Sequence, residues 1–326
     1  MLYTKLGQTG LKVSKLCLGT YNFDFTSDLE QSKNILDLAF ELGINFIDTA
    51  DIYGWHGKGV GSVESLIGDW LKNNSGKREK IILATKVYGE MGDGVNDKGL
   101  SKYHILNACE KSLARLKTDH IDVYFMHHSD PKTPLDEIWQ AFEILIHQGK
   151  VLYIGTSNYA AWQVAKNDAA AKKRNLLGVV AEQPRYHLAA RLIELELIPA
   201  LRDLGIGLLP WSPLGGGLLA GRIVDRNDTG RRSREKKQKE FEEHKDQIEK
   251  YEKFCSELGE EPSSIALAWL LHNPVVTAPI IGPRTLHQLK SSMRSLEVKL
   301  GNVELEKLDE IWPGPEKEAP EAYALW

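Results

Sequence analysis

Short apolar runs rich in Val, Ile and Leu recur along the chain, and each is followed by a longer amphipathic stretch. Near-continuous apolar strands that alternate with helices are typical of a parallel sheet covered by helices. Most runs begin about 30 to 40 residues after the one before, which is the length of a strand–helix–strand unit. They predict eight strands, at Leu16–Leu18, Asn45–Ile47, Ile81–Thr85, Ile121–Met126, Val151–Ile154, Val179–Ala181, Gly207–Pro210 and Thr277–Ile281.

The segments between the runs carry helical signals. In Asp28–Leu42 the apolar residues recur on one face at a spacing of about 3.6 residues. Ser27 and Glu30 predict a capping box at the start of this helix, and Gly43 suits the left-handed position after its end. Similar segments predict helices at Ser101–Leu116, Leu135–Gln148, Ala160–Arg174 and Ser263–Asn273.

Eight strand–helix units without an edge strand favour a closed (β/α)8 barrel, and its usual size suits one domain over residues 1–326. A doubly wound sheet is the alternative, but no GxGxxG motif follows the first strand.

Three segments fall outside the alternation of strands and helices. Leu2–Ser14, with turn residues at Gly7 and Gly10, predicts an N-terminal hairpin. Arg222–Glu261 is expected to be a long inserted loop before the last strand, in which RRSREKKQKEFEEHK predicts a solvated helix laced with opposite charges. The proline-rich C-terminal tail WPGPEKEAPEAYALW is expected to lie over the surface.

The composition limits the partners. The chain has 41 basic and 45 acidic residues, whereas a strongly basic face usually marks a nucleic-acid or anionic-membrane partner. Its three cysteines form no CxxC pair, which argues against a disulfide framework and suits a reducing compartment. There is no signal-peptide pattern, and no apolar run approaches the roughly 18 residues of a membrane span. We therefore expect a cytoplasmic protein with neither nucleic acid nor membrane as partner; monomer and homo-oligomer both stay open.

Several predicted strands end in polar side chains, and the C-terminal strand ends are where barrel enzymes carry their active sites. The second strand leads into Asp48 and Tyr53, the third ends at Lys86, and the fourth leads into His127 and His128. Each residue alone has an ordinary explanation, such as a helix cap or a solvated charge. Together they bring charged groups to the C-terminal ends of the barrel strands. Buried charges need partners, so these groups are expected to pair with one another there.

The sequence resembles the aldo-keto reductases, and is similar to the branch that holds bacterial and plant reductases and the potassium-channel β subunits. The resemblance implies a (β/α)8 barrel that reduces aldehyde or ketone carbonyls with NADPH. It also implies a catalytic tetrad of Asp48, Tyr53, Lys86 and His127. The motifs that carry it stand in family order: FIDTADIYG, ATKVYG, IDVYFMHHSD, YIGTSNY, EQPRYHL and WSPLGGGLLAGR.

The chemistry of carbonyl reduction suits the four residues of this tetrad. Hydride reduction builds charge on the carbonyl oxygen, which must then receive a proton. A tyrosine, with an ordinary pKa of about 10, is a poor acid unless a neighbouring ammonium such as Lys86 favours its phenolate. Asp48 can hold that ammonium against Tyr53, and His127 can donate to the substrate oxygen.

The resemblance also implies the cofactor residues. Asn158 and Gln183 hold the nicotinamide carboxamide with Ser157 beside them, and Trp211 offers a flat face for stacking. The 2′-phosphate of the adenosine is expected at a helix N-terminus, which favours anions, and the guanidinium of Arg284 can donate two hydrogen bonds to it. The pyrophosphate stretch matches Ser212, Leu214, Gly216, Leu218 and Arg222, and the adenosine 2′-phosphate site matches Gly282, Arg284, Thr285 and Gln288. Ser292 departs from the family, which commonly has Asn there.

Loops are expected to add Tyr21, Trp55 and His128 to a substrate pocket for a small carbonyl compound. No metal is expected, because adjacent strand residues point to opposite faces and His127 and His128 would not serve one ion.

Two functions stay open. One is an NADP-dependent enzyme. The other is an NADPH-binding regulatory subunit with little turnover, like the channel β subunits, which also keep the tetrad. No long extra N-terminal segment that might plug a pore precedes the hairpin, which favours the enzyme. A sugar-phosphate barrel enzyme would not explain WSPLGGGLLAGR.

Overall fold

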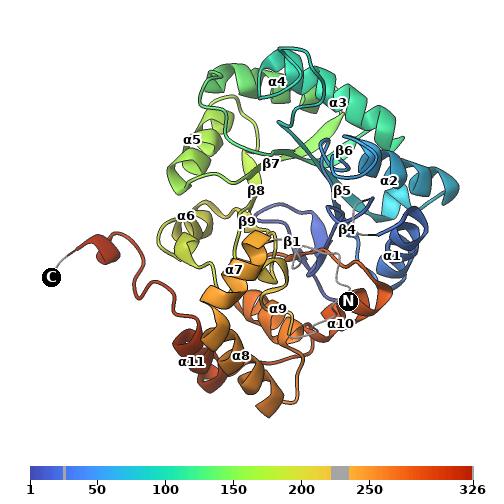
Figure 1. Ribbon diagram of the computed structural model, residues 1–326. Helices are drawn as coiled ribbons and strands as arrows, with labels where there is room; N and C mark the ends of the chain where they lie inside the picture. The colour runs from blue at the N-terminus through green and yellow to red at the C-terminus, as the bar shows by residue number, and fades with distance from the viewer. Residues whose placement is uncertain (25–26, 222–234, 325–326) are drawn as a thin grey trace.

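The computed structural model describes residues 1–24, 27–221 and 235–324. In this part of the chain eight parallel strands form a barrel surrounded by helices (Figure 1). They pair in the order β10-β3-β4-β5-β6-β7-β8-β9. The strands are β3 (Cys17–Gly19), β4 (Phe46–Asp48), β5 (Ile82–Val87), β6 (Ile121–Met126), β7 (Val151–Ser157), β8 (Val179–Gln183), β9 (Gly207–Leu208) and β10 (Ile280–Ile281).

The sheet closes between β9 and the segment that leads into β10, which confirms the predicted barrel. The last two strands are regular over only two residues each. Pro210 and Pro279 flank them and have no N–H to donate to a strand ladder. The closing bonds run from the N–H of Leu208 to the oxygen of Val275 (3.2 Å), from Thr277 to Leu208 (2.9 Å) and from Ile280 to Pro210 (2.8 Å).

Helices cover the outside of the barrel, and the five that the sequence predicted are present with ends within two residues of the prediction. Three others, α2, α6 and α11, were not predicted, and α10 was expected only as a helix N-terminus beside Arg284. The helices are α1 (Leu29–Glu41), α2 (Ser62–Asn73), α3 (Lys102–Leu116), α4 (Leu135–His147), α5 (Ala161–Lys172), α6 (Leu197–Leu204), α9 (Pro262–His272), α10 (Leu286–Arg294) and α11 (Asn302–Ile311).

The start of α1 differs from the prediction. Asp28 is the N-cap residue, and its Oδ1 accepts the N–H of Gln31 at 2.7 Å. Ser27 instead donates its hydroxyl to the backbone oxygen of Arg284 at 3.1 Å. At the other end Gly43 has a φ of +81°, the left-handed conformation that the sequence predicted after the helix.

The predicted N-terminal hairpin is present as antiparallel strands β1 (Tyr3–Lys5) and β2 (Lys12–Ser14). Leu6 and Val13 are fully buried and belong to the apolar cluster inside the barrel. Gly7 has a φ of +55°, and a Cβ there would lie 2.7 Å from the backbone oxygen of Val180. Glycine therefore allows the hairpin to seal the N-terminal end of the barrel.

The insertion before β10 is not a loop throughout. Residues 235–257 form two helices, α7 (Glu235–Glu243) and α8 (Lys245–Glu257). The charged sequence of α7 forms the predicted helix and pairs Lys239 with Glu243 at 3.9 Å. The predicted long loop is wrong for α8, because it buries Ile248, Tyr251, Phe254 and Cys255 at helical spacing. Residues 222–234 lie outside the described residues.

The C-terminal segment leaves the barrel after Trp312, which is itself buried. Arg191 fastens this end, because its Nη1 donates to Asp309 at 2.5 Å and to the oxygen of Trp312 at 2.8 Å. Beyond it the chain runs beside α6, where Arg202 pairs with Glu318 at 2.9 Å, and its end projects from the barrel (Figure 1).

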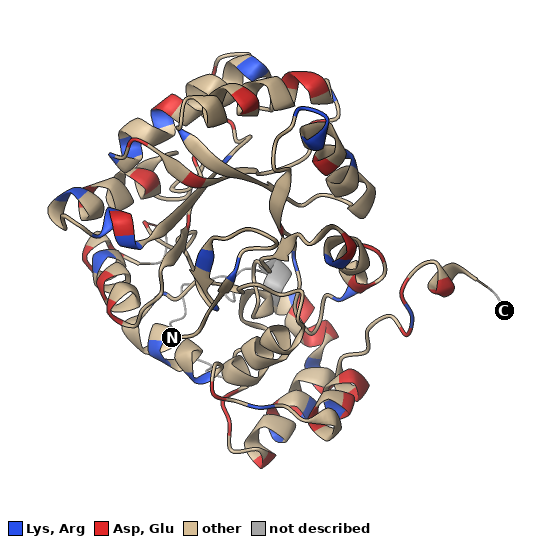
Figure 2. Cartoon of the chain, turned by 180° about the vertical axis from the view of Figure 1, so that it is seen from behind, with Lys and Arg blue, Asp and Glu red and all other residues tan. Residues whose placement is uncertain are grey.

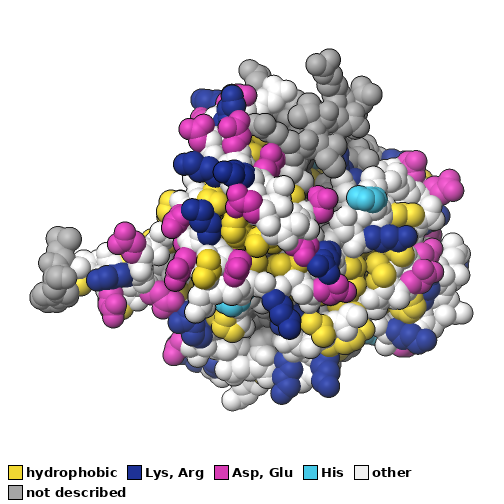
Figure 3. Space-filling model, turned by 90° about the horizontal axis from the view of Figure 1, so that it is seen from below, with side chains coloured by type: hydrophobic (Ala, Val, Ile, Leu, Met, Phe, Trp, Pro, Cys, Tyr) yellow, Lys and Arg dark blue, Asp and Glu magenta, His cyan; other side chains and the backbone are white. Residues whose placement is uncertain are grey.

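Charged residues lie mainly on the outer helices and loops, whereas the strands carry few (Figure 2). On the face seen from below, basic and acidic side chains are interspersed over the described residues (Figure 3). None of the helices in the described ranges combines the length and the apolar character needed to cross a membrane.

Candidate active site

The four residues of the predicted tetrad come together at the C-terminal end of the barrel. Asp48 is the last residue of β4, Lys86 precedes the last residue of β5, and His127 follows β6. Tyr53 lies in the loop after β4, where its N–H donates to the oxygen of Ala50 at 3.1 Å. The parallel strands all end on the same rim, which is why residues distant in sequence meet there.

Lys86 is held by three acceptors. Its Nζ donates to Asp48 Oδ2 at 2.5 Å, to the backbone oxygen of Thr49 at 2.7 Å and to Tyr53 Oη at 3.3 Å. An ammonium has three hydrogens, so these contacts use its full donor capacity. The Lys86 side chain is 2% exposed and that of Asp48 is 3% exposed. The ion pair is therefore shielded from water, and the cation is fixed against the phenol of the half-buried Tyr53.

Burial alone would lower the pKa of Lys86, but the charge of Asp48, helped by Tyr53, outweighs burial and raises it. Lys86 therefore stays protonated at neutral pH. The pKa of His127 is lowered well below its usual value, first by burial and then by the charge of Lys86. Its imidazole is therefore neutral at neutral pH, and its ring centroid lies 6.0 Å from that of Tyr53.

The rings of His127 and His128 lie on the same side of the chain. They are stacked, with centroids 5.1 Å apart and planes 13° apart. The expectation that they point to opposite faces is wrong, because β6 ends at Met126 and strand alternation no longer applies beyond it. Within the described ranges no three His, Cys, Asp or Glu residues gather as a metal site would require.

Further aromatic rings contact the tetrad and its neighbour His128. The ring of Tyr21 meets that of Tyr53 edge-on with centroids 5.3 Å apart. Tyr88, which the sequence reasoning passed over, meets His128 at the same distance. Trp55 is 54% exposed and lies against His56 instead. The structure thus brings Tyr21 and His128 to the tetrad but shows no ring contact of Trp55 with it among the described residues.

The predicted nicotinamide residues also lie together, next to His127. Ser157 ends β7 and pairs with Gln183 at the end of β8. The backbone oxygen of Gln183 accepts the Ser157 hydroxyl at 2.9 Å and the N–H of Asn158 at 3.1 Å. The Asn158 side chain donates to the oxygen of His127 at 3.1 Å and accepts Trp211 Nε1 at 3.0 Å. These residues therefore form one connected rim.

The predicted pyrophosphate stretch has an unusual backbone. Ser212 and Gly215–Gly217 all have positive φ, and the glycines follow Leu214, whose φ is −102°. Right-handed followed by left-handed residues turn successive N–H groups toward one side and form a concavity that suits phosphate. Leu218 is 2% exposed and packs in the apolar core. Arg222 lies outside the described residues.

The predicted 2′-phosphate residues surround the N-terminus of α10. Thr285 is the N-cap, and its Oγ1 accepts the N–H of Gln288 at 3.2 Å. Gln288 Oε1 accepts the N–H of Arg284 at 2.8 Å, and Asn22 donates to the oxygen of Gly282 at 2.6 Å. These contacts hold the loop at a helix end that favours anions. Separately, the Ser292 hydroxyl donates to the oxygen of Gln288 at 2.9 Å.

Sequence reasoning missed three features of the rim. Thr49 contributes a backbone oxygen, which no side-chain pattern reveals. The contact of Gln183 Nε2 with Asp48 Oδ1 at 2.8 Å crosses the barrel. Glu182, which follows the predicted strand Val179–Ala181, is fully buried, accepts the N–H of Tyr159 at 3.1 Å, and has its pKa raised by burial to about 7.

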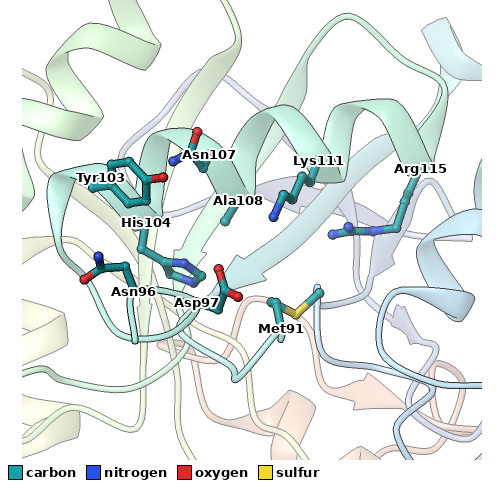
Figure 4. A pocket seen from close by; sticks show the side chains of 9 residues that line it. All are labelled: Met91, Asn96, Asp97, Tyr103, His104, Asn107, Ala108, Lys111 and Arg115. Atoms are coloured by element: carbon teal, nitrogen blue, oxygen red, sulfur yellow. The ribbon is translucent and has the colours of Figure 1, made fainter. Parts of the chain in front are cut away.

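A separate hollow of about 180 Å³ lies between α3 and the loop before it (Figure 4). Lys111, Arg115, His104 and Asp97 line it, and no member of the tetrad does. It therefore does not belong to the site at the strand ends.

Comparison with known proteins agrees with this arrangement. The model of the aldo/keto reductase family matches residues 15–313. The chain is 51% identical over 328 residues to Bacillus subtilis YrpG, named an uncharacterized oxidoreductase, and the match covers 99% of this chain and 100% of that protein. It is 36% identical to a putative voltage-gated potassium channel subunit beta of Schizosaccharomyces pombe, over 94% of this chain and 92% of that protein.

A probable voltage-gated potassium channel subunit beta of Arabidopsis thaliana is 32% identical, over 99% of this chain and 100% of that protein. The family match spans the whole barrel and every strand end that carries a predicted site residue. The chain therefore belongs to the aldo/keto reductase family and is an oxidoreductase.

Proposed function

We propose that the protein reduces aldehyde or ketone carbonyls to alcohols, with NADPH as reductant. One observation carries the proposal: the phenol of Tyr53 lies 3.3 Å from a buried ammonium that Asp48 holds in place. A phenol beside a fixed cation can give up its proton, because the cation stabilises the phenolate that remains.

Each member of the tetrad then has one task. Tyr53 Oη gives its proton to the substrate oxygen as negative charge builds there. Lys86 stabilises the phenolate, and Asp48 keeps Lys86 charged and in place. His127, neutral because of burial and the charge of Lys86, orients the carbonyl by donating a hydrogen bond to it.

The described residues fit a bound nicotinamide dinucleotide. Asn158 and Gln183 would hold the carboxamide, Trp211 would stack on the ring, and the backbone around Leu214 would receive the pyrophosphate. Arg284 and the N-terminus of α10 would receive the 2′-phosphate, which is the basis for proposing NADPH. Charge-assisted hydrogen bonds of this kind contribute about 1.5–3 kcal/mol. The cofactor supplies the hydride when bound.

The channel subunits among the relatives favour a second candidate. The chain covers most of each of those proteins at more than 30% identity. The same dinucleotide site would then serve a regulatory subunit with little turnover. The tetrad geometry is compatible with both functions, so turnover decides between them.

Tyr53→Phe tests the proposal. The substitution removes the proton donor but keeps the ring, so single-turnover reduction of a reactive aromatic aldehyde should fall about 10²- to 10⁴-fold. NADPH affinity, measured by quenching of tryptophan fluorescence, should hardly change. Tyr103→Phe is the matched control, because Tyr103 is 65% exposed on α3 and its hydroxyl should not matter.

If Tyr53→Phe keeps most of the parent rate, Tyr53 is not the acid. Equal affinity of the parent for NADPH and NADH would contradict the assignment of Arg284. A parent that binds NADPH tightly yet turns over negligibly with aldehydes, α-ketoesters, quinones and sugars would establish the regulatory function instead.

A further inference from the structure

Gln183 reaches across the interior of the barrel to the ion pair of the tetrad. Its Nε2 lies 2.8 Å from Asp48 Oδ1, while Lys86 Nζ lies 2.5 Å from Asp48 Oδ2. Each oxygen of the carboxylate thus has its own partner. A carboxylate paired with an ammonium only accepts hydrogen bonds, so the Gln183 atom facing it must be the amide nitrogen.

The barrel fixes both ends of this contact. β4 and β8 are four strands apart in the eight-stranded barrel, and side chains of alternate strands share one layer of its interior. The backbone of Gln183 is anchored through its oxygen by Ser157 and Asn158. Gln183 is 1% exposed and Asp48 is 2% exposed, so water cannot readily replace either partner.

The contact matters because Lys86 depends on how Asp48 is oriented. Without Gln183, one oxygen of a buried carboxylate would lose its partner, which is costly for a charged group. The carboxylate would turn toward other donors and move the ammonium with it. The distance of 3.3 Å from Lys86 to Tyr53 is already at the long end for a hydrogen bond, so a small displacement would separate them.

We propose that Gln183 is a positioning residue for the proton donor: by holding Asp48 Oδ1 it keeps the Asp48–Lys86 pair oriented and Lys86 against Tyr53. This role is additional to the nicotinamide contact that the proposed function gives to Gln183. Only the kinetic part of the test below rests on the proposed function. Gln183 thereby joins the predicted cofactor rim to the acid through a single side chain.

Two substitutions separate positioning from cofactor binding. Gln183→Leu removes the donor. Gln183→Glu keeps the shape but can donate to Asp48 only when its carboxyl is protonated, and two carboxyls this close share one proton. Asn158→Ala is the control, because Asn158 belongs to the same rim but its side chain contacts His127, Ser157 and Trp211 rather than Asp48.

The first measurement needs no cofactor. Tyrosine labelled with ¹³C at Cζ is titrated by NMR, and the Tyr53 signal is assigned by its loss in Tyr53→Phe. The Tyr53 midpoint should rise by about one pH unit in Gln183→Leu, which corresponds to a tenfold weaker preference for phenolate. It should stay at the parent value in Asn158→Ala.

The second measurement is single-turnover carbonyl reduction against pH at saturating NADPH. Gln183→Glu should approach the parent rate at low pH, where the shared proton lets it donate, and should lose activity as the pair deprotonates. Gln183→Leu should be at least tenfold slower at every pH.

Tyr53 midpoints equal to the parent value in both Gln183 variants, with weaker NADPH binding, would make Gln183 a cofactor contact only and overturn the proposal. If Gln183→Leu does not fold, the pH dependence of the rate in the isosteric Gln183→Glu decides, because the charge added at high pH would itself raise the Tyr53 midpoint. A shifted Tyr53 midpoint in a protein whose parent does not reduce carbonyls would sustain the positioning role and refute the proposed function.

Discussion

At the scale of single residues, β8 ends in two buried polar side chains with different electrostatic settings. Gln183 is neutral and satisfies the charge of Asp48. No described residue forms an ion pair with its neighbour Glu182, and burial raises the pKa of Glu182 to about 7. Folding therefore favours the protonated form of Glu182, whereas the unfolded chain would ionise near the ordinary value of about 4.3.

Glu182→Gln should change how stability depends on pH. The pKa of Glu182 is higher in the folded protein than in the unfolded chain. The free energy of unfolding of the parent therefore carries no penalty from Glu182 below about pH 4, and it falls as the pH rises from there to about 7. The glutamine variant lacks this loss and still accepts the N–H of Tyr159. Relative to the parent, it should gain on the order of 2–3 kcal/mol in unfolding free energy between pH 5 and pH 8.

Urea unfolding at several pH values measures this gain. Glu306→Gln on α11, where the side chain is exposed, is the control and should run parallel to the parent. A Glu182→Gln curve that also runs parallel to the parent would mean that Glu182 is ionised in the folded state.

The meeting of Asp48, Lys86 and His127 could be predicted because they stand at strand ends that are visible in the sequence, and the family resemblance added Tyr53. The partners of those side chains could not. The contact of Gln183 with Asp48 joins residues 135 positions apart and depends on strand tilt and register. The stacking of His127 on His128 depends on where β6 ends, and a strand end is uncertain by a residue or more in any sequence pattern.

At the scale of elements, a buried carboxylate joins α2 and α3 behind the strand that carries Lys86. Glu64 of α2 is fully buried. It accepts hydrogen bonds from Arg115 at 2.7 Å, from Thr85 at 2.6 Å and from Ser112 at 3.3 Å. Thr85 is the residue before Lys86 in β5, so this cluster supports the strand that carries Lys86 into the candidate active site.

Arg115→Met should destabilise the protein by about 3 kcal/mol or more, because it leaves the buried charge of Glu64 without its cation. Adding Glu64→Gln to it should restore much of the loss, because no uncompensated charge remains. Lys307→Met is the control: its pair with Glu310 is more than half exposed, and such pairs contribute about 0–1 kcal/mol. Chemical denaturation of the four proteins checks this, and equal losses in the two single variants would contradict it.

Most elements with strong local signals could be predicted, and those without such signals could not. α1, α3, α4, α5 and α9 showed clear periodicity. α2 has an apolar face too, but it begins after Gly61, which has a φ of +81° and offers no side-chain cap. α8 was hidden in a charged insertion, because its four buried residues are separated by Glu and Lys residues that look like a solvated loop.

At the scale of the whole molecule, the hairpin closes one end of the barrel and its fit is steric. Gly7→Ala should destabilise the protein by about 2 kcal/mol or more, since the added Cβ would meet three backbone atoms within 3.0 Å at a positive φ. Two other glycines provide controls. Gly10→Ala meets nothing within 4 Å, and Gly76→Ala has the positive φ but open space.

Thermal unfolding should therefore rank the three alanine variants. Gly10→Ala should match the parent, Gly76→Ala should lose about 1 kcal/mol through backbone strain alone, and Gly7→Ala should lose the most. If Gly7→Ala were no worse than Gly76→Ala, the hairpin would have room to shift, and the seal at the base of the barrel would be loose.

The position of β3 between β4 and β10 has a consequence for biosynthesis. β4 follows β3 closely in the sequence, whereas the partners on the other side of β3 are synthesised last. Cys17 of β3 pairs with Ile280, and Asn22 donates to the oxygen of Gly282, 260 residues away. While the ribosome makes the intervening chain, β3 presents an open edge, and open edges recruit strands from other molecules. Contacts so distant in sequence also form slowly. The nascent chain thus becomes safe from edge-to-edge association only when its final strand docks.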